Sequence, residues 1–279
     1  MTVPNSRRQY TVPGRAILLY LAIFFFFIVF NGLLLFLPFD MRVGSILTQI
    51  VVILGGALIY RKYFAHSEVK WPDLRRLGMG PLALILVLLC SVALGLMSNA
   101  LVALQLELFP ALKEPAMQYQ ELVENLLLPE SISAQIVAAI AVAVVAPICE
   151  EVLFRGTILA EQRRGQLAAG AIILNGLLFS LMHLSNPVGF LALAIVGAYF
   201  AHITLRSDAL WGAILGHAAL NFVNGVLLIR VAQYMEIDSV EAVEEVELLP
   251  LIGLVVFLVV AVALLWWLSI RLMDRRREE

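Results

Sequence analysis

The chain has 279 residues, of which 62% are hydrophobic and only 14% charged, and its net charge is −2 with a pI near 6.1. Soluble domains are usually about a quarter charged, so this composition excludes an ordinary soluble domain, and the near-neutral charge gives no reason to expect a nucleic-acid partner. A β-barrel is disfavoured, because its strands alternate polar and apolar residues, whereas this sequence has long apolar runs.

Apolar runs of about 20 residues, the length that a helix needs to cross a bilayer, recur along the whole chain. They predict an all-α, polytopic membrane protein with about eight transmembrane helices. The first run is too long for a secretory signal peptide and lacks a small-residue cleavage site, so we expect it to remain as a membrane anchor. In chain order, the spans are expected at residues 16–38, 44–64, 82–106, 132–160, 167–185, 188–205, 208–230 and 249–271.

Basic residues predict the orientation of these spans, because cytoplasmic loops carry an excess of lysine and arginine. Placing both termini in the cytoplasm puts most of the basic residues on that side. Arg42, Lys113 and Arg230 then lie outside, and Arg155 lies within a span. We therefore predict an integral, multi-pass protein of the lipid bilayer with cytoplasmic N- and C-termini, and we expect it in a prokaryotic cell membrane.

The two longer outer loops in this arrangement, residues 107–131 and 231–248, are acidic. Residues 117–128 and 240–249 place apolar side chains at roughly helical spacing, in or beside these loops. We interpret both segments as helices that form a lid on the membrane surface, in preference to a binding site.

The fourth span contains the stretch PICEEVLFRG, residues 147–156, which places three charged residues at membrane depth. Such a charge costs about 2.5–3.5 kcal/mol on insertion scales, so each needs a partner or a water-filled cavity. Glu151 and Arg155 share a helix face and can form an ion pair. Glu150 points about 100° away and has no partner within the motif. Burial and repulsion from Glu151 favour its protonation, which suits a general base, and Pro147 can kink the helix to open a pocket.

Two further pairs of residues lie four positions apart on later spans. Phe179 and His183 occur near the end of the fifth span, and His217 and Asn221 occur in the seventh. Taken singly, each is explained by packing or by interhelical hydrogen bonds of ~0.6–2 kcal/mol. Taken together with the paired carboxylates, they supply the base, the water-orienting group and the oxyanion donors that hydrolysis inside a membrane needs. A structural role is expected for three other polar residues: Asn175, His202 and Asn224.

The predicted depths of these residues disagree in one respect. At 1.5 Å per residue, Glu150 and His217 lie roughly 13–15 Å from the cytoplasmic helix ends, whereas His183 lies about 25 Å from its own. The three side chains can meet only if the fifth helix is tilted or shortened.

The ordered set EEVLFR (150–155), FSLMH (179–183) and HAALN (217–221) resembles the EExxxR, FxxxH and HxxxN motifs of the CPBP intramembrane proteases. This family includes the Rce1-type CAAX prenyl endopeptidases and the bacterial Abi proteins. The resemblance covers roughly residues 130–230, with no departure at the key positions. It divides the chain into N-terminal transmembrane helices with an outer loop (1–130), a CPBP-like catalytic core (131–230), and an outer loop with a C-terminal transmembrane helix (231–279).

The resemblance implies an intramembrane endopeptidase whose partner is a membrane-associated protein or peptide substrate. In the family's scheme, Glu150 is the general base that activates water, and His183 positions that water and carries its proton. His217 and Asn221 form the oxyanion hole. Three residues are implied as supports of these groups: Glu151, Arg155 and Phe179.

Metal dependence stays open from the sequence. Glu150, His183 and His217 with a water molecule are a plausible zinc set, so zinc is the alternative cofactor. The chain lacks HExxH, which would place two ligands one turn apart, and Asn221 suits a hydrogen-bond donor better than a ligand. We therefore favour a glutamate mechanism with no cofactor.

Two other functions compete with proteolysis. A proton-coupled membrane transporter also uses intramembrane glutamate and histidine, but transporters often have two related halves, which this sequence does not show. A non-catalytic membrane scaffold with a protease fold is conceivable because fold does not fix function, but such a scaffold needs neither His183 nor Asn221.

Overall fold

The computed structural model describes residues 14–163, 167–235 and 247–278. The described part of the chain is mostly helical and contains no β-strand, only an isolated bridge between Asp73 and Ala209. Seven of its helices are long and apolar enough to cross a membrane, which confirms the predicted all-α polytopic membrane protein. They are Gly14–Leu34, Met41–Tyr63, Pro81–Leu108, Ile132–Gln162, Phe190–Ser207, Trp211–Tyr234 and Leu248–Arg275.

The helix expected at residues 167–185 is present but shorter than predicted. This helix, α9, spans Ala168–Met182 and has 15 residues, so it is roughly 22 Å long and falls short of the ~30 Å hydrocarbon core. It ends where His183 leaves the helical conformation. Pro187 follows in the next turn, and its ring would clash with a continuing helix. The prediction of eight full-length spans is therefore wrong for this segment.

Three of the spans are interrupted by π-helical segments, which are rare and occur frequently at functional sites. The second span consists of α2 Met41–Thr48, η1 Gln49–Leu54 and α3 Gly55–Tyr63. The fourth consists of α6 Ile132–Ile140, η3 Ala141–Val145, α7 Ala146–Leu153, η4 Phe154–Ile158 and α8 Leu159–Gln162. The span after α10 consists of α11 Trp211–Leu220, η5 Asn221–Leu227 and α12 Leu228–Tyr234.

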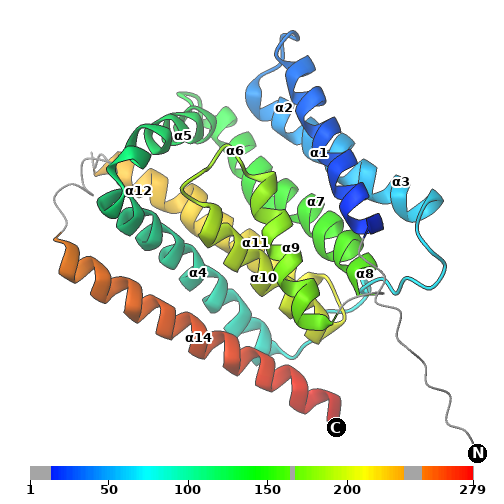
Figure 1. Ribbon diagram of the computed structural model, residues 1–279. Coiled ribbons are helices and arrows are strands. Elements are labelled where there is room, and N and C mark those ends of the chain that lie inside the picture. Colours follow the sequence, from blue (N-terminus) through cyan, green and yellow to red (C-terminus); the bar gives the residue numbers. More distant parts are fainter. Residues whose placement is uncertain (1–13, 164–166, 236–246, 279) are drawn as a thin grey trace, which may run out of the picture.

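The remaining helices are uninterrupted and pack around these spans. They are α1 Gly14–Leu34, α4 Pro81–Leu108, α5 Lys113–Leu127, α10 Phe190–Ser207 and α14 Leu248–Glu278, with a short 3₁₀ turn η2 at Pro110–Leu112. The long helices α4 and α14 lie side by side (Figure 1), and α11 also packs against α4. Helix α7 packs against both η1 and α11, so its side chains are enclosed from two sides.

Helices α9 and α10 approach each other closely at a pair of glycines. A Cβ on Gly176 would collide with the main chain of α10, and a Cβ on Gly197 would collide with Gly176. Small residues permit such approach between membrane helices. The approach also leaves the Gly197 carbonyl within reach of the neighbouring span.

Helix α5 lies at one end of the bundle (Figure 1), and two arginines hold its C-terminus. Arg42 donates to the main-chain carbonyls of Asn125 and Leu126, and Arg230 donates to that of Leu127. Cations stabilise a helix C-terminus because its last carbonyls lack partners and carry the negative end of the helix dipole. Both arginines belong to the three basic residues that the predicted orientation leaves outside, so a local structural role accounts for their position.

The structure confirms one of the two predicted surface helices. Residues 117–128 correspond to α5, which spans Lys113–Leu127. Residues 240–249 fall mostly outside the described residues. The cytoplasmic placement of both termini stays a prediction.

Candidate active site

The two adjacent carboxylates, Glu150 and Glu151, lie on α7 between the π-helical segments η3 and η4. Pro147 has no N–H, so a carbonyl one turn earlier loses its helical partner. Asn221 Nδ2 donates to the Val142 carbonyl at 2.9 Å. Val142 is five residues before Pro147, which is the spacing of a π-helical hydrogen bond. Asn221 therefore joins the start of η5 to the break in the neighbouring helix.

The ion pair expected between Glu151 and Arg155 is present. Arg155 Nη1 lies 2.9 Å from Glu151 Oε1, and both side chains are fully buried. Arg155 also donates to the Gly197 carbonyl at 2.9 Å, and its guanidinium lies 4.7 Å from the ring centroid of Phe179. His217 is a further partner of Glu151, because its Nδ1 lies 2.8 Å from the same Oε1. A carboxylate only accepts, so Nδ1 donates and the ring orientation is fixed.

Glu150 faces both histidines. Its Oε2 lies 3.9 Å from His183 Nε2 and 4.0 Å from His217 Nε2. Its Oε1 accepts a hydrogen bond from Gln49 Nε2 at 2.8 Å. His183 follows the end of α9, and its Nδ1 lies 2.9 Å from the Phe179 carbonyl. Because a carbonyl only accepts, Nδ1 of His183 donates, and its Nε2 is directed at Glu150.

The predicted difference in depth between His183 and Glu150 is therefore wrong. The estimate assumed a straight helix that crosses the whole membrane, whereas α9 has 15 residues and ends directly before His183. The shortened helix brings the imidazole to the level of the carboxylate, 3.9 Å away.

Phe179 packs against several of these groups. Its ring centroid lies 4.8 Å from that of His183, 5.7 Å from that of His217 and 5.2 Å from that of Phe154. The ring is fully buried, with 1% exposure. Contacts on several sides restrict the rotamers of both imidazoles, which is the supporting position that the sequence predicts for Phe179.

A cavity of about 540 Å³ contains this cluster. Separations of 3.9 and 4.0 Å are too long for direct hydrogen bonds, but a water about 2.8 Å from each atom would bridge them at an angle of about 90°. The space between Glu150 and the imidazoles therefore fits a water molecule. The cavity is also lined by polar residues from several helices: Gln49, Asn99, Tyr119, Ser185, Asn186, Asn221 and Asn224.

Helix α5 forms part of the cavity wall, which agrees with its interpretation as a lid. Tyr119, Val123 and Leu126 of this helix line the cavity. Burial raises the pKa of Tyr119, and a side-chain hydrogen bond to Asn186 partly offsets this rise. The Arg42 contact to the Leu126 carbonyl thus holds a segment that borders the candidate site.

The carboxylate and imidazoles are spaced too widely for a zinc ion. Zinc bonds of about 2.0–2.2 Å in a tetrahedron place the ligand atoms about 3.3–3.6 Å apart, whereas Glu150 Oε2 lies 3.9 and 4.0 Å from the Nε2 atoms of His183 and His217. Among the described residues, no three His, Cys, Asp or Glu side chains form a group that could hold a metal ion. In this arrangement the residues do not fit the zinc set that the sequence leaves open.

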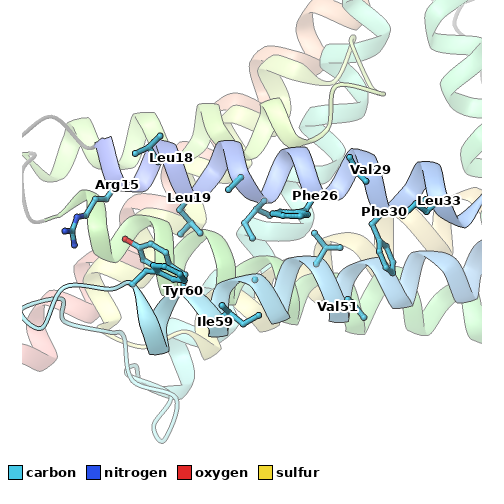
Figure 2. Close-up of a pocket in the computed structure, with 15 residues that line it drawn as sticks. Arg15, Leu18, Leu19, Phe26, Val29, Phe30, Leu33, Val51, Ile59 and Tyr60 are labelled. Carbon is cyan, nitrogen blue, oxygen red and sulfur yellow. The ribbon is translucent and has the colours of Figure 1, made fainter.

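A larger cavity lies away from this cluster. It has a volume of about 920 Å³ and runs between α1 and the η1–α3 segment (Figure 2). Its lining is apolar apart from Arg15 and Tyr60, which lie near one end in Figure 2. The lining contains no carboxylate or imidazole, so this groove offers no group for hydrolysis, and the smaller cavity is the candidate site.

Sequence motifs do not reveal two of the contacts at the site. Gln49 reaches Glu150 from 101 residues earlier in the chain, and the Gly197 carbonyl reaches Arg155 from 42 residues later. The available signal for Gln49 was its position as an amide in an apolar run, QIVVIL. Asn175 has the structural role expected of it, since its amide donates to the Phe154 carbonyl.

Comparison with known protein families gives one match. Residues 132–223, about a third of the chain, match the family model described as type II CAAX prenyl endopeptidase Rce1-like. The match confirms the resemblance predicted from the three motifs, and it implies peptidase activity. A search of curated proteins and a search of solved structures found no match.

Proposed function

We propose that this chain, through its Rce1-like domain at residues 132–223, is an intramembrane endopeptidase that cleaves a membrane-associated protein or peptide. One observation carries the proposal. The Glu150 carboxylate faces Nε2 of both His183 and His217 across a space that fits a water molecule, in a cavity between membrane-spanning helices.

Glu150 acts as the general base in this proposal. A water between Glu150 and His183 gives one proton to Glu150 Oε2, and its oxygen attacks the carbonyl carbon of the scissile peptide bond. His183 Nε2 accepts the water's other hydrogen and so orients the attacking lone pair. Glu150 then returns its proton to the amine nitrogen as the C–N bond breaks, which leaves a free carboxyl group and a free amine. A positioned base typically contributes about 10²–10⁴-fold to the rate.

His217 and Asn221 stabilise the oxyanion. His217 Nδ1 already donates to Glu151, so donation from Nε2 requires an imidazole that carries both protons. The charges favour this state, because Glu150 and Glu151 against Arg155 leave one negative charge that an imidazolium neutralises. Asn221 uses one amide hydrogen on a main-chain carbonyl and keeps the other for the oxyanion. Removal of one such donor costs roughly 2.7–4 kcal/mol in enzymes of this kind of chemistry.

The cavity holds its substrate mainly through hydrogen bonds. Its described lining contains amides and hydroxyls but no lysine or arginine. The family's description names CAAX prenyl endopeptidases, so prenylated peptides with a free C-terminus are one substrate class for assay. Internal segments of membrane-associated proteins are the other, and a panel should contain both.

Replacement of Glu150 tests the proposal. Glu150→Gln keeps the shape of the side chain and removes the base, so we expect a loss of cleavage of at least about 10²-fold with unchanged expression and detergent stability. Glu124→Gln, which changes an exposed carboxylate on α5, is the matched control. Full activity of Glu150→Gln would overturn the base assignment. Metal content and chelator sensitivity of the same preparation test cofactor use, and inactivation that zinc reverses would make these side chains ligands.

The orientation is part of the proposal. We place the N- and C-termini in the cytoplasm of a prokaryotic cell. Both cysteines, Cys90 and Cys149, are buried, so a single cysteine added at either terminus should react alone with an impermeant thiol reagent in inverted vesicles. Reaction in intact cells instead would contradict this orientation.

A further inference from the structure

Gln49 touches the proposed base from a helix outside the Rce1-like match. It is the first residue of η1, and its Nε2 lies 2.8 Å from Glu150 Oε1. A carboxylate only accepts hydrogen bonds, so this contact fixes the orientation of the amide with Nε2 on Glu150. We propose that Gln49 is a positioning residue that holds Glu150 charged and directs its second oxygen at the imidazoles; this inference rests on the proposed function.

The geometry gives the two oxygens of Glu150 different tasks. Oε1 is occupied by Gln49, and Oε2 faces His183 and His217 at 3.9 and 4.0 Å. The terminal torsion of a glutamate is broad and has no strong preference of its own. A hydrogen bond to one oxygen restricts that torsion, so Gln49 keeps Oε2 in the place from which it can take a proton from water.

The charged groups around Glu150 make Gln49 the direct support of its charge. His183 from α9 and His217 from α11 lie beyond hydrogen-bond distance. Glu151, the next residue on α7, repels Glu150, and its charge is paired with Arg155 of η4. Within the described chain, the amide of Gln49 is the donor that reaches the carboxylate. Donation to the charged form of an acid favours that form.

Packing alone does not explain a glutamine at this position. The rest of η1 is apolar, with the sequence IVVIL after Gln49. The Oε1 atom of Gln49 is buried and has no hydrogen-bond partner among the described residues. An unpaired buried acceptor is unfavourable, so an apolar residue would serve packing better. Gln49 also lines the cavity, where a water or a substrate N–H can reach this oxygen.

The experiment compares Gln49→Leu with a matched control. Gln105→Leu removes another half-buried glutamine, which donates to the main-chain carbonyls of Leu101 and Val188 and does not line the cavity. The first readout is the acid limb of the pH profile of kcat/KM, which reports the essential base of the free enzyme. The second is labelling of Glu150 by an apolar carbodiimide, which reacts with protonated carboxyl groups, with Glu150→Gln identifying the labelled site.

We expect Gln49→Leu to move the acid limb and the labelling midpoint together to higher pH by about one to two units, the size of one hydrogen bond to a charged group. Below the limb, each unit is an about tenfold loss of kcat/KM. Gln49→Glu, which replaces the donor by a second carboxylate, should move both further in the same direction, and Gln105→Leu should move neither.

The two readouts separate failure of this inference from failure of the proposed function. A labelling midpoint that is unchanged in Gln49→Leu overturns the role of Gln49, whatever the protein cleaves. A shifted midpoint with no shift of the acid limb shows that Gln49 acts on Glu150 but that Glu150 is not the base, which overturns both. Reduced activity at all pH values without either shift assigns Gln49 a structural role only.

Discussion

Glu151 has two partners whose roles can be separated by mutation. Its Oε1 accepts from Arg155 at 2.9 Å and from His217 at 2.8 Å, and its side chain is fully buried. The first contact is an ion pair that the fold needs. The second places the imidazole and, in the proposed mechanism, balances its positive charge. Glu151→Gln should therefore reduce both stability and activity, for different reasons.

The effect on stability follows from the buried charge. Glu151→Gln leaves the Arg155 guanidinium, which has 0% exposure, without a counter-charge. Loss of one partner of a buried pair costs about 3–5 kcal/mol. Adding Arg155→Met removes the unpaired charge, since replacement of a whole buried pair by apolar residues is often neutral or stabilising. The Gly197 carbonyl then loses its donor, at about 1–3 kcal/mol, so the double variant should unfold within about 2 kcal/mol of the wild type.

The effect on activity should not recover in the double variant. His217 would lack its anionic partner in both variants, and the corresponding change in the serine-protease triad lowers kcat by about 10⁴-fold. We expect a loss of at least 10²-fold in cleavage, measured beside detergent unfolding of the same preparations. A double variant that regains wild-type turnover would refute the reasoning, because Glu151 would then act only as the partner of Arg155.

Two further predictions concern Asn221 and the arginines that hold α5. Asn221→Ala should lower kcat by about 10²–10³-fold but lower stability by only about 0.6–2 kcal/mol, because it removes an oxyanion donor and one hydrogen bond to the Val142 carbonyl; a loss of stability without loss of kcat, measured by steady-state kinetics and detergent unfolding, would make Asn221 purely structural. Arg42→Leu should speed hydrogen exchange in residues 119–127 at least tenfold, because it frees the carbonyls of Asn125 and Leu126, while exchange in α4 stays unchanged; unchanged exchange in α5 would show that Arg42 does not hold this helix.

The fold class could be predicted because membrane insertion imposes strong local constraints. A span needs about 20 apolar residues, and this length can be read directly from the sequence. The structure confirms seven such helices in the described chain. The exception, α9, illustrates the limit of the rule. Its sequence is apolar as far as Leu184, but the main chain turns at His183, and hydropathy contains no information about where a helix stops inside an apolar run.

The local geometry of the site was predictable for the same kind of reason. Residues four apart on a helix are neighbours, and this rule correctly predicts the contact of Glu151 with Arg155. It also predicts the proximity of Phe179 to His183, whose ring centroids are 4.8 Å apart. The contact of His217 with Glu151 joins residues 66 positions apart. A single sequence does not encode such contacts in its periodicity.

Gln49 escaped prediction because the cost of burial depends on charge. The argument that singled out Glu150 was the large penalty for an ionised group at membrane depth. An amide carries a smaller penalty, and several amides lie in or near the spans of this chain, so none of them stands out by that criterion. What distinguishes Gln49 is its position opposite the one carboxylate that its own motif leaves without a partner. The unpaired charge, more than the amide, was therefore the useful signal: a buried carboxylate with no local donor implies that some other span supplies one.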